Sequence, residues 1–405
     1  MELNRAWVLN SDRSYVHMVV GKVQSGKTGE IIRLCEYLLS KEIKPLVIVR
    51  NRKCDVEQFV GRFPGASDEE RGRVQTMYDM LDAKGRFIGS LNNKVPLVVM
   101  GNKSQLLKAH ELLMSTGVEY TVIKDEGDMH YQSKSRDEKP TECKLNLLEE
   151  GSNNVYSFTA TVASLVRNQP DSGSYKIYDM SLSTNYYGVG HFKHVPIRSR
   201  VTYDFDSHSL MDKDDIDKVY NEGLKSPKAW GIHNTSRMRF VQYAISDYIQ
   251  ENFPQYVVMT YNGTGTLVHV PQDTADARHK TITFEGGVPI SRVLTLFKNY
   301  KYLTVITGDL ANRGISFVSD DYSVHCDFQY YRCLNGHPHG EQLLQACRLS
   351  GVYRDTTAPT LKFYCEPETW ELIQKHYDYS NQNENSYQIY KELEKSETVC
   401  RPKLN

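Results

Sequence analysis

The chain has 405 residues, of which 40% are hydrophobic and 24% charged, a composition typical of globular proteins that excludes a disordered, collagen-like or coiled-coil chain. Lys and Arg total 49 against 50 for Asp and Glu, so the net charge of −1 does not favour a basic protein that coats nucleic acid. A local basic channel on a neutral body is still compatible with nucleic-acid binding. At roughly 150 residues per domain, the length predicts two or three domains.

Neither a membrane span nor a disulfide or zinc framework is indicated. No apolar run approaches the roughly 20 residues needed to cross a bilayer. The segment Met1–Asn10 lacks the apolar stretch of a secretion signal. The 8 cysteines are scattered and form no C-x-x-C pair. We therefore expect a cytoplasmic protein with reduced cysteines and no membrane partner.

In the first part of the chain, short β-branched runs alternate with helix-like stretches, the pattern of a mostly parallel sheet with crossover helices. An apolar stripe predicts a helix over Thr28–Ser40, and a second helix is expected at Ser104–Met114. The strands expected in this part are Tyr15–Val20, Pro45–Val49, Pro96–Met100, Tyr120–Ile123 and Asn154–Phe158.

The pattern dissolves over residues 169–227, which predicts a connector with an irregular insertion, and a second alternation begins at Lys228. Its expected strands are Ala229–His233, Tyr256–Thr260, Leu267–Val270, Leu303–Thr307, Ser323–Phe328 and Leu361–Tyr364, and its expected helices are Ser236–Glu251, Ile290–Asn299 and Gly340–Leu349. The sequence thus predicts an α/β fold with two units, an N-terminal ATPase domain over 1–168 and a second domain over 228–405 that ends in helices.

A phosphate-binding loop is the most specific motif. Residues Gly21–Thr28, GKVQSGKT, fit G-x-x-x-x-G-K-[ST] between an expected strand and an expected helix. In such loops the backbone N–H groups and the helix N-terminus face the phosphates, the lysine reaches the β- and γ-phosphates, and the hydroxyl ligates Mg²⁺. The residues expected to bind ATP here are Gly21, Gln24, Ser25, Gly26, Lys27 and Thr28.

An acidic pair follows the strand Tyr120–Ile123. In a phosphate-loop ATPase, one carboxylate at a neighbouring strand end holds Mg²⁺ and a second polarises the attacking water. Asp125 suits the metal role and Glu126 the water-orienting role.

Two motifs in the second half follow the same logic. One is TGDLANRG, which contains Gly308 and Arg313, and the other is QACRLSG, which contains Gln345 and Arg348. An Arg and a Gln at the start of a helix in a second α/β unit can reach toward a γ-phosphate.

In this order, the strings GKVQSGKT, KDEGD, SFTAT, TGDLANRG and QACRLSG resemble a superfamily 2 helicase core of two RecA-like domains. The chain is most similar to the Z-one domain family of phage and bacterial ATPases, over about residues 14–365. The resemblance implies a phage or viral source, in which case the protein would act inside the host cell. It also implies that Thr159 and Thr161 couple the site to nucleic acid, that Gly308, Arg313 and Gly314 sit at a cleft, and that Gln345 and Arg348 sense the γ-phosphate.

The motifs depart from the family pattern at three points. Gly127 replaces the usual Ala or His after Glu126, which is expected to change little, and Val162 replaces a Pro in the T-A-T-P turn. The position three residues after Arg348 is Gly351 rather than Arg, so Arg348 or Arg354 is the arginine finger, with Arg348 favoured.

Nucleic acid would lie across the strand ends, held mainly through its backbone. The residues expected to contact phosphates are Arg50, Asn51, Arg52, Lys103 and Ser104. The resulting hypothesis is an ATP-dependent motor, a DNA helicase or translocase that uses ATP and Mg²⁺. The alternative is an ATP-gated, nucleic-acid-binding scaffold or accessory subunit of a nuclease or replication complex that does not unwind. DNA is favoured over RNA.

Overall fold

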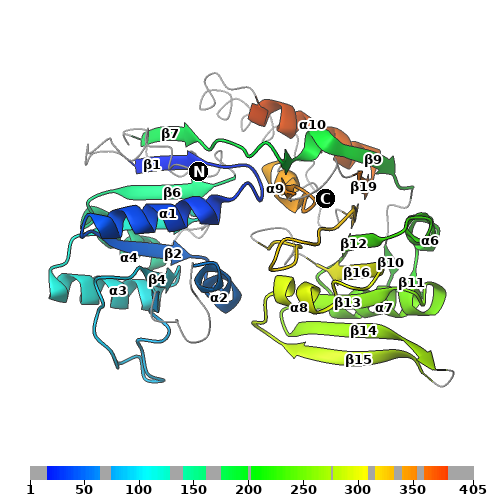
Figure 1. The fold of residues 1–405 in the computed structure, drawn as a ribbon, viewed down its shortest axis with the longest axis horizontal. Coiled ribbons are helices and arrows are strands. Elements are labelled where there is room, and N and C mark those ends of the chain that lie inside the picture. The colour runs from blue at the N-terminus through cyan, green and yellow to red at the C-terminus, as the bar shows by residue number, and fades with distance from the viewer. Residues whose placement is uncertain are drawn as a thin grey trace. The chain divides into compact units, whose positions relative to one another are not determined.

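The computed structural model describes residues 16–63, 74–127, 140–160, 175–198, 202–274, 277–308, 315–332, 340–353 and 360–381. In these segments the chain forms two compact units. The first contains residues 16–22 and 26–182, and the second contains residues 23–25 and 183–381. Both are α/β units with helices on the two faces of a central sheet (Figure 1).

A seven-stranded sheet forms the centre of the first unit, and its neighbouring strands are parallel throughout. In spatial order the strands are β3 (Gln75–Thr76), β4 (Leu97–Met100), β2 (Lys44–Val49), β5 (Tyr120–Asp125), β6 (Val155–Thr159), β1 (Val16–Val20) and β7 (Tyr175–Asp179). Parallel pairing brings the carboxyl ends of these strands to one edge of the sheet, where Val20 pairs with Thr159 and Asp125 with Phe158.

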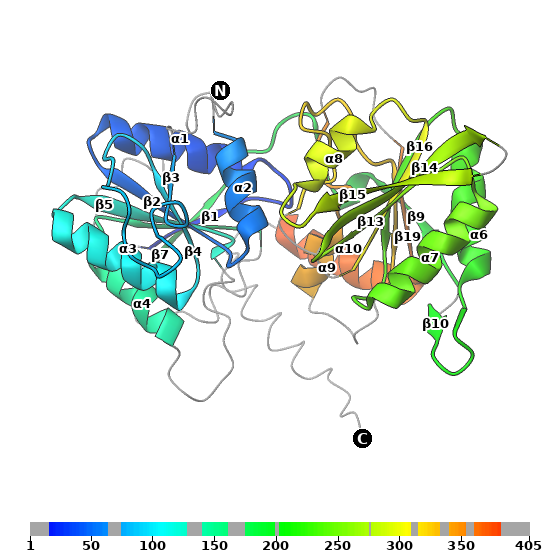
Figure 2. The same cartoon turned by 90° about the horizontal axis from the view of Figure 1, so that it is seen from below.

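The helices of the first unit alternate with the strands and cover both faces. Helices α1 (Lys27–Ser40) and α2 (Lys53–Gly61) share one hydrophobic cluster with the sheet, and α3 (Lys103–Thr116) and α4 (Pro140–Glu150) pack together on the other face (Figure 2). The apolar stripe expected on α1 is confirmed, since Ile31, Ile32, Leu34, Cys35 and Leu38 are buried. Helix α2 was not expected from the sequence.

The second unit contains an eight-stranded sheet with one antiparallel edge. In spatial order its strands are β15 (Ala277–Glu285), β14 (Gly265–Thr274), β13 (Val257–Asn262), β16 (Tyr302–Thr307), β12 (Ala229–Asn234), β17 (Phe328–Tyr331), β19 (Leu361–Cys365) and β9 (Phe192–Pro196). Strands β13 to β15 pair antiparallel, and the remaining pairs are parallel.

Helices also cover both faces of this sheet. Helices α6 (Lys213–Leu224) and α7 (Arg239–Asn252) lie on one face. Helices α8 (Ile290–Leu296), α9 (Gly340–Ala346) and α10 (Pro367–Asn381) lie on the other. Smaller elements are the pair β8 (Tyr186–Tyr187) with β18 (Gly351–Val352), the hairpin β10 (Tyr203–Asp204) and β11 (Ser209–Leu210), and the 3-10 turn Val189–His191.

The stretch 169–227, expected as a connector with an insertion, contributes regular elements in its described residues. It supplies β7 to the first sheet, β9 to the second, and α6 to a face of the second. Weak periodicity concealed these elements because β7 and β9 are edge strands with partly exposed, mixed residues.

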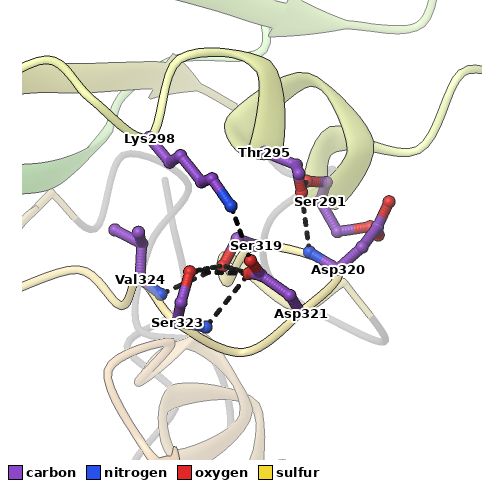
Figure 3. A network of polar contacts seen from close by, with 8 residues as sticks. All are labelled: Ser291, Thr295, Lys298, Ser319, Asp320, Asp321, Ser323 and Val324. Carbon is purple, nitrogen blue, oxygen red and sulfur yellow. Dashed lines mark hydrogen bonds and ion pairs between the residues drawn. The ribbon is translucent and has the colours of Figure 1, made fainter.

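The strand expected at Ser323–Phe328 is wrong. A polar turn at Ser319–Ser323 precedes this range (Figure 3), and within it only an isolated bridge at His325 and the first residue of β17, Phe328, form β pairings. The Asp321 carboxylate accepts from the hydroxyls of Ser319 (2.6 Å) and Ser323 (2.7 Å) and from Lys298 Nζ (2.9 Å). These donors hold the pKa of Asp321 well below its usual range. Val324 and Cys326 are buried in alternation with more polar residues, a pattern that predicted a strand. The strand β17 begins only at Phe328.

Lys44, at the amino end of β2, is a fully buried lysine. Its Nζ donates to the carbonyls of Asn92 (2.7 Å) and Val95 (2.5 Å). Burial lowers the pKa of Lys44 to about 7, because it penalises the charged ammonium. Within the described segments, every helix is too short or too polar to cross a bilayer.

We predict that Lys44 makes the unfolding free energy depend on pH. Its pKa is depressed in the folded state, so its contribution is greatest above about pH 10 and is lost as the pH falls toward about 7. The Lys44→Met variant keeps a long apolar side chain without the amine, so its unfolding free energy should not change with pH between about 7 and 10 through this group. Urea unfolding of both proteins at several pH values measures the difference, and identical pH profiles would contradict the assignment.

Candidate functional site

The phosphate loop joins β1 to α1 at the carboxyl edge of the first sheet. The Gly21 N–H donates to the Thr159 carbonyl at 2.9 Å, which ties the start of the loop to β6. Gly26 lies at φ 97°, a conformation that favours glycine, and it precedes α1 as its N-cap. The N–H groups of Gly29 and Glu30 donate back to the Gly26 carbonyl. The loop therefore turns directly into a helix N-terminus, where anions are favoured.

Lys27 and Thr28 begin the helix, as the motif requires. Lys27 Nζ donates to the carbonyls of Gly21 (3.3 Å) and Lys22 (3.2 Å), so the ammonium lies over the loop. The Thr28 hydroxyl accepts from Arg62 at 3.1 Å. Arg62 caps the C-terminal end of α2, and because that helix was not expected, sequence reasoning missed this contact.

Gln24 and Ser25 form the remainder of the loop. Gln24 has a positive φ of 56°, which is uncommon for a residue with a side chain. The Ser25 hydroxyl is buried, and among the described residues no protein group bonds to it. A buried hydroxyl in a loop of this kind fits a ligand with acceptor oxygens, such as a phosphate.

Asp125 ends β5 and Glu126 follows it. Burial and the adjacent charge of Glu126 raise the pKa of Asp125 to about 6, while Lys27 and Arg50 lower it. The acidic pair, the loop lysine and Arg50 therefore lie close enough to affect one another's charge. Glu126 is 9% exposed, with a φ of 49°. A residue held in this region stores roughly 1–3 kcal/mol, and such strain concentrates at functional sites.

Gly127 packs directly against β6. A Cβ at Gly127 would lie 2.9 Å from the Cβ of Ser157, closer than side chains pack. Gly127, which was expected to behave like the usual Ala or His, therefore allows the acidic motif to approach β6 more closely than a residue with a Cβ would. Thr159 ends β6 and is buried, and the neighbouring Thr161 and Val162 lie outside the described residues.

Arg50 is part of a buried ion pair. Its Nε and a terminal nitrogen donate to the two carboxylate oxygens of Asp55 at 2.7 and 2.8 Å, and both side chains are at most 10% exposed. Breaking such a pair from one side costs roughly 3–5 kcal/mol. Arg50 thus has a structural task at the end of β2, and its contact with nucleic acid stays a prediction.

The other residues expected to contact phosphates are exposed at the same edge. Asn51 and Arg52 follow β2, and Lys103 and Ser104 start α3 after β4. Asn102 links the two strand ends, because its side chain caps α3 at Gln105 N and donates to Asn51 Oδ1 at 2.9 Å. We call this the strand-end edge: Asn51, Arg52, Asn102, Lys103 and Ser104.

In the second unit, Arg348 of the motif QACRLSG contacts the residue that follows the motif TGDLANRG. Arg348 is 5% exposed and donates through a terminal nitrogen to the carbonyl of Ile315 at 3.3 Å. Gln329 of β17 holds the turn, since its oxygen accepts from Arg348 N (2.8 Å) and its nitrogen donates to Asn234 Oδ1 (2.6 Å) and the Ala346 carbonyl (2.7 Å). Sequence reasoning missed Gln329, which lies inside a strand and carries no motif signal.

The remaining predicted residues of this unit are placed as follows. Gln345 is buried near the end of α9, and Arg348 follows that helix, so the expectation that both lie at the start of a helix is wrong. Gly308 follows β16, and a Cβ there would lie 2.9 Å from the Arg237 backbone, so the glycine permits close packing of the chain. Arg313, Gly314 and Arg354 lie outside the described residues.

The residues of the first unit fit nucleotide phosphates and Mg²⁺. Backbone N–H groups, the Lys27 ammonium and the Thr28 hydroxyl suit phosphate oxygens. In the described segments no three His, Cys, Asp or Glu residues cluster as a metal cage. Mg²⁺ usually takes one or two carboxylates plus substrate phosphates rather than such a cage, so Asp125 with Thr28 fits this mode.

Neither a model of a known protein family nor a curated protein sequence matches the chain. Solved structures do. The structure of S. cerevisiae Dbp5 bound to RNA and ADP–BeF3 matches with a TM-score of 0.51 and 11% identity, covering 94% of this chain and 89% of that chain. A variant of Dbp5 bound to RNA and ADP–BeF3 matches with a TM-score of 0.47 and 12% identity, covering 93% and 88%.

The first of these matches shows the fold. The chain has an α/β fold of two RecA-like domains, as the sequence predicted. At 11% identity, this similarity does not assign a role to any residue of the chain. The resemblance to the Z-one domain family stays a prediction.

We predict that Gly127→Ala destabilises the first unit and slows nucleotide hydrolysis. The added Cβ overpacks against Ser157, which typically costs roughly 1–3 kcal/mol and here displaces the acidic motif. Adding Ser157→Gly should restore much of the activity, whereas Ser157→Ala, which keeps the Cβ, should not. Urea unfolding and hydrolysis rates test this, and wild-type values for Gly127→Ala would refute the close contact.

Proposed function

We propose that the chain is an ATP-dependent nucleic-acid motor, a helicase or translocase of the superfamily 2 type. The observation that carries the proposal is the convergence of the phosphate loop, the acidic pair and an exposed basic edge on the carboxyl ends of one parallel sheet. The Dbp5 structure with the same fold contains RNA and ADP–BeF3, which supports a nucleotide and a nucleic-acid strand as ligands.

The proposed roles follow from the chemistry of each group. Lys27 neutralises the β- and γ-phosphates, and Thr28 with Asp125 would hold Mg²⁺, which supplies further charge to the phosphates. Glu126 orients the attacking water and accepts its proton. From the second unit, we propose that Gln345 and Arg348 sense the γ-phosphate and that Gly308 and Arg313 contribute to nucleotide binding.

Nucleic acid is proposed to bind the strand-end edge through its phosphates, with DNA favoured over RNA. The competing function is an ATP-gated scaffold for a nuclease or replication partner. Hydrolysis measured with no strand, single strands, duplexes and forks of DNA and RNA separates these functions. Stimulation by a strand together with fork opening identifies a helicase, and stimulation without fork opening identifies a translocase. Hydrolysis that is indifferent to every strand identifies the scaffold.

We further propose that the protein acts in the cytoplasm.

We predict that Glu126→Gln retains ATP binding but hydrolyses ATP ~10²-fold more slowly or worse, as loss of a water-orienting base implies. The glutamine keeps the shape of the side chain, so the protein should stay folded. Nucleotide affinity and single-turnover rates are the measurements. Collapse of affinity with an unchanged rate in the bound complex would instead make Glu126 a binding residue.

We predict that single strands stimulate hydrolysis with a salt-dependent affinity, since phosphate contacts release counterions. The log–log slope should be about −0.7 per phosphate neutralised. Replacing Arg52 and Lys103 by Gln should flatten this slope and raise the strand concentration needed for half-maximal stimulation. These residues are preferred to Arg50, whose loss would break the buried pair with Asp55. A slope unchanged in the double variant would move the phosphate contacts elsewhere.

A further inference from the structure

An exposed tyrosine follows β3 at the carboxyl edge of the first sheet. Tyr78 is 52% exposed, whereas Met77 and Met80 on either side of it are 0% and 4% exposed. The turn therefore buries Met77 and Met80 and leaves Tyr78 and Asp79 exposed to solvent. A tyrosine presented in this way differs from a surface residue on a mobile loop.

Hydrogen bonds hold this turn in one conformation. The Thr76 hydroxyl donates to the Asp79 carboxylate at 2.6 Å and accepts from the Asp79 N–H at 3.1 Å. The Met80 N–H donates to the Thr76 carbonyl at 3.2 Å, and the Met77 N–H donates to Val98 of β4 at 2.8 Å. Because the backbone is fixed to the sheet, little conformational entropy is lost when the ring binds a partner.

A lysine covers one face of the ring. Lys53 Nζ lies 5.0 Å from the centroid of the Tyr78 ring, a cation–π distance. Lys53 is the first residue of α2 and directly follows Arg52 of the strand-end edge. The ammonium occupies one face, and about half of the residue remains open to solvent.

Sheet order places this ring beside the strand-end edge. Strand β3 pairs with β4, and β4 pairs with β2, all in parallel. Their carboxyl ends carry in turn Tyr78, Lys103 with Asn102, and Arg52 with Lys53. An aromatic ring among exposed cations is the combination by which proteins bind single strands, with phosphates on the cations and a base on the ring.

We propose that Tyr78 is a base-stacking residue: an unpaired base of a single strand stacks on its ring while neighbouring phosphates contact Arg52 and Lys103. This inference rests on the proposed function, which supplies the nucleic-acid strand. It adds a contact to one base of that strand to the proposed contacts with its phosphates. Stacking tolerates any base because every base has a π-face, so the contact requires a base without reading its identity. Bases inside a duplex are already stacked, so the contact favours single strands.

The test uses the full-length protein and short homopolymer strands, DNA and RNA, that carry one abasic site moved along the strand. Dissociation constants are measured by fluorescence anisotropy at fixed salt. Wild type should lose about 5-fold or more in affinity when the abasic site falls at one position, the lower range for one stacked base. Tyr78→Ala should bind the intact strand as weakly as wild type binds that abasic strand, and should not distinguish the two strands.

Two variants serve as controls. Tyr78→Phe keeps the ring and should restore both the affinity and the abasic penalty. Tyr300→Ala removes another exposed aromatic side chain, 39% exposed, just before the amino end of β16 in the second unit, and should behave as wild type. The salt slope should be the same for all four proteins, because the phosphate contacts are unchanged.

The outcomes separate this inference from the function on which it rests. If wild type binds strands but Tyr78→Ala binds them equally well, or loses affinity equally on intact and abasic strands, stacking on Tyr78 is refuted and the motor proposal stands. If wild type binds no single strand of DNA or RNA, both proposals fall.

Discussion

The parallel pairing of the first sheet is the constraint on which the candidate site depends. Parallel strands end at one edge, and here the phosphate loop, Asp125 and the two exposed loops after β2 and β4 all follow strand ends. Residues more than 100 positions apart, such as Gly21 and Thr159, become hydrogen-bonded neighbours through this arrangement alone. Ligands bind open α/β sheets at this edge because the loops there are free to carry polar groups while the strands stay buried.

The charged side chains around the acidic pair at this edge are largely buried, so they strongly affect one another's pKa values. Arg50 and Asp55 neutralise each other in a bidentate pair, and Arg50 also lowers the pKa of Asp125, which burial and Glu126 raise. A carboxylate pair at a buried strand end is unfavourable by itself, because like charges repel and desolvation penalises both. Two cations, Lys27 and Arg50, offset that cost here. Because Asp55 also lies in this group, three carboxylates face two cations, and the remaining negative charge makes the site attractive to a further cation, which is the property a magnesium site requires.

The sequence predicted the parts of this structure whose signal is local. The apolar stripe of α1, the motif at Gly21–Thr28 and the strand before Asp125 each lie within a short window, and the structure contains all three elements. It did not predict α2 or the edge strands β7 and β9, where partial exposure weakens periodicity. Gln329, Arg62 and the contact of Gly127 with Ser157 also escaped, because each acts through a partner distant in the chain. At Ser323–Phe328, the buried Val324 and Cys326 resembled a strand, but the chain leaves the turn around Asp321 in an irregular conformation and the strand begins only at Phe328.

The two classes of group at the strand-end edge differ in how much freedom binding removes. Arg52 and Lys103 are long, exposed side chains, and each loses roughly 2 kcal/mol of rotamer freedom when fixed. Their attraction to phosphate is also screened by salt. The Asn102 side chain is held by its hydrogen bond to the start of α3, and the backbone around Tyr78 is held by the hydrogen bonds of its turn, so less freedom remains to be lost there. In the proposed complex, contacts of the first kind would let a strand slide, since every phosphate is alike, whereas a ring on an ordered turn would hold one base until it leaves and the next can stack.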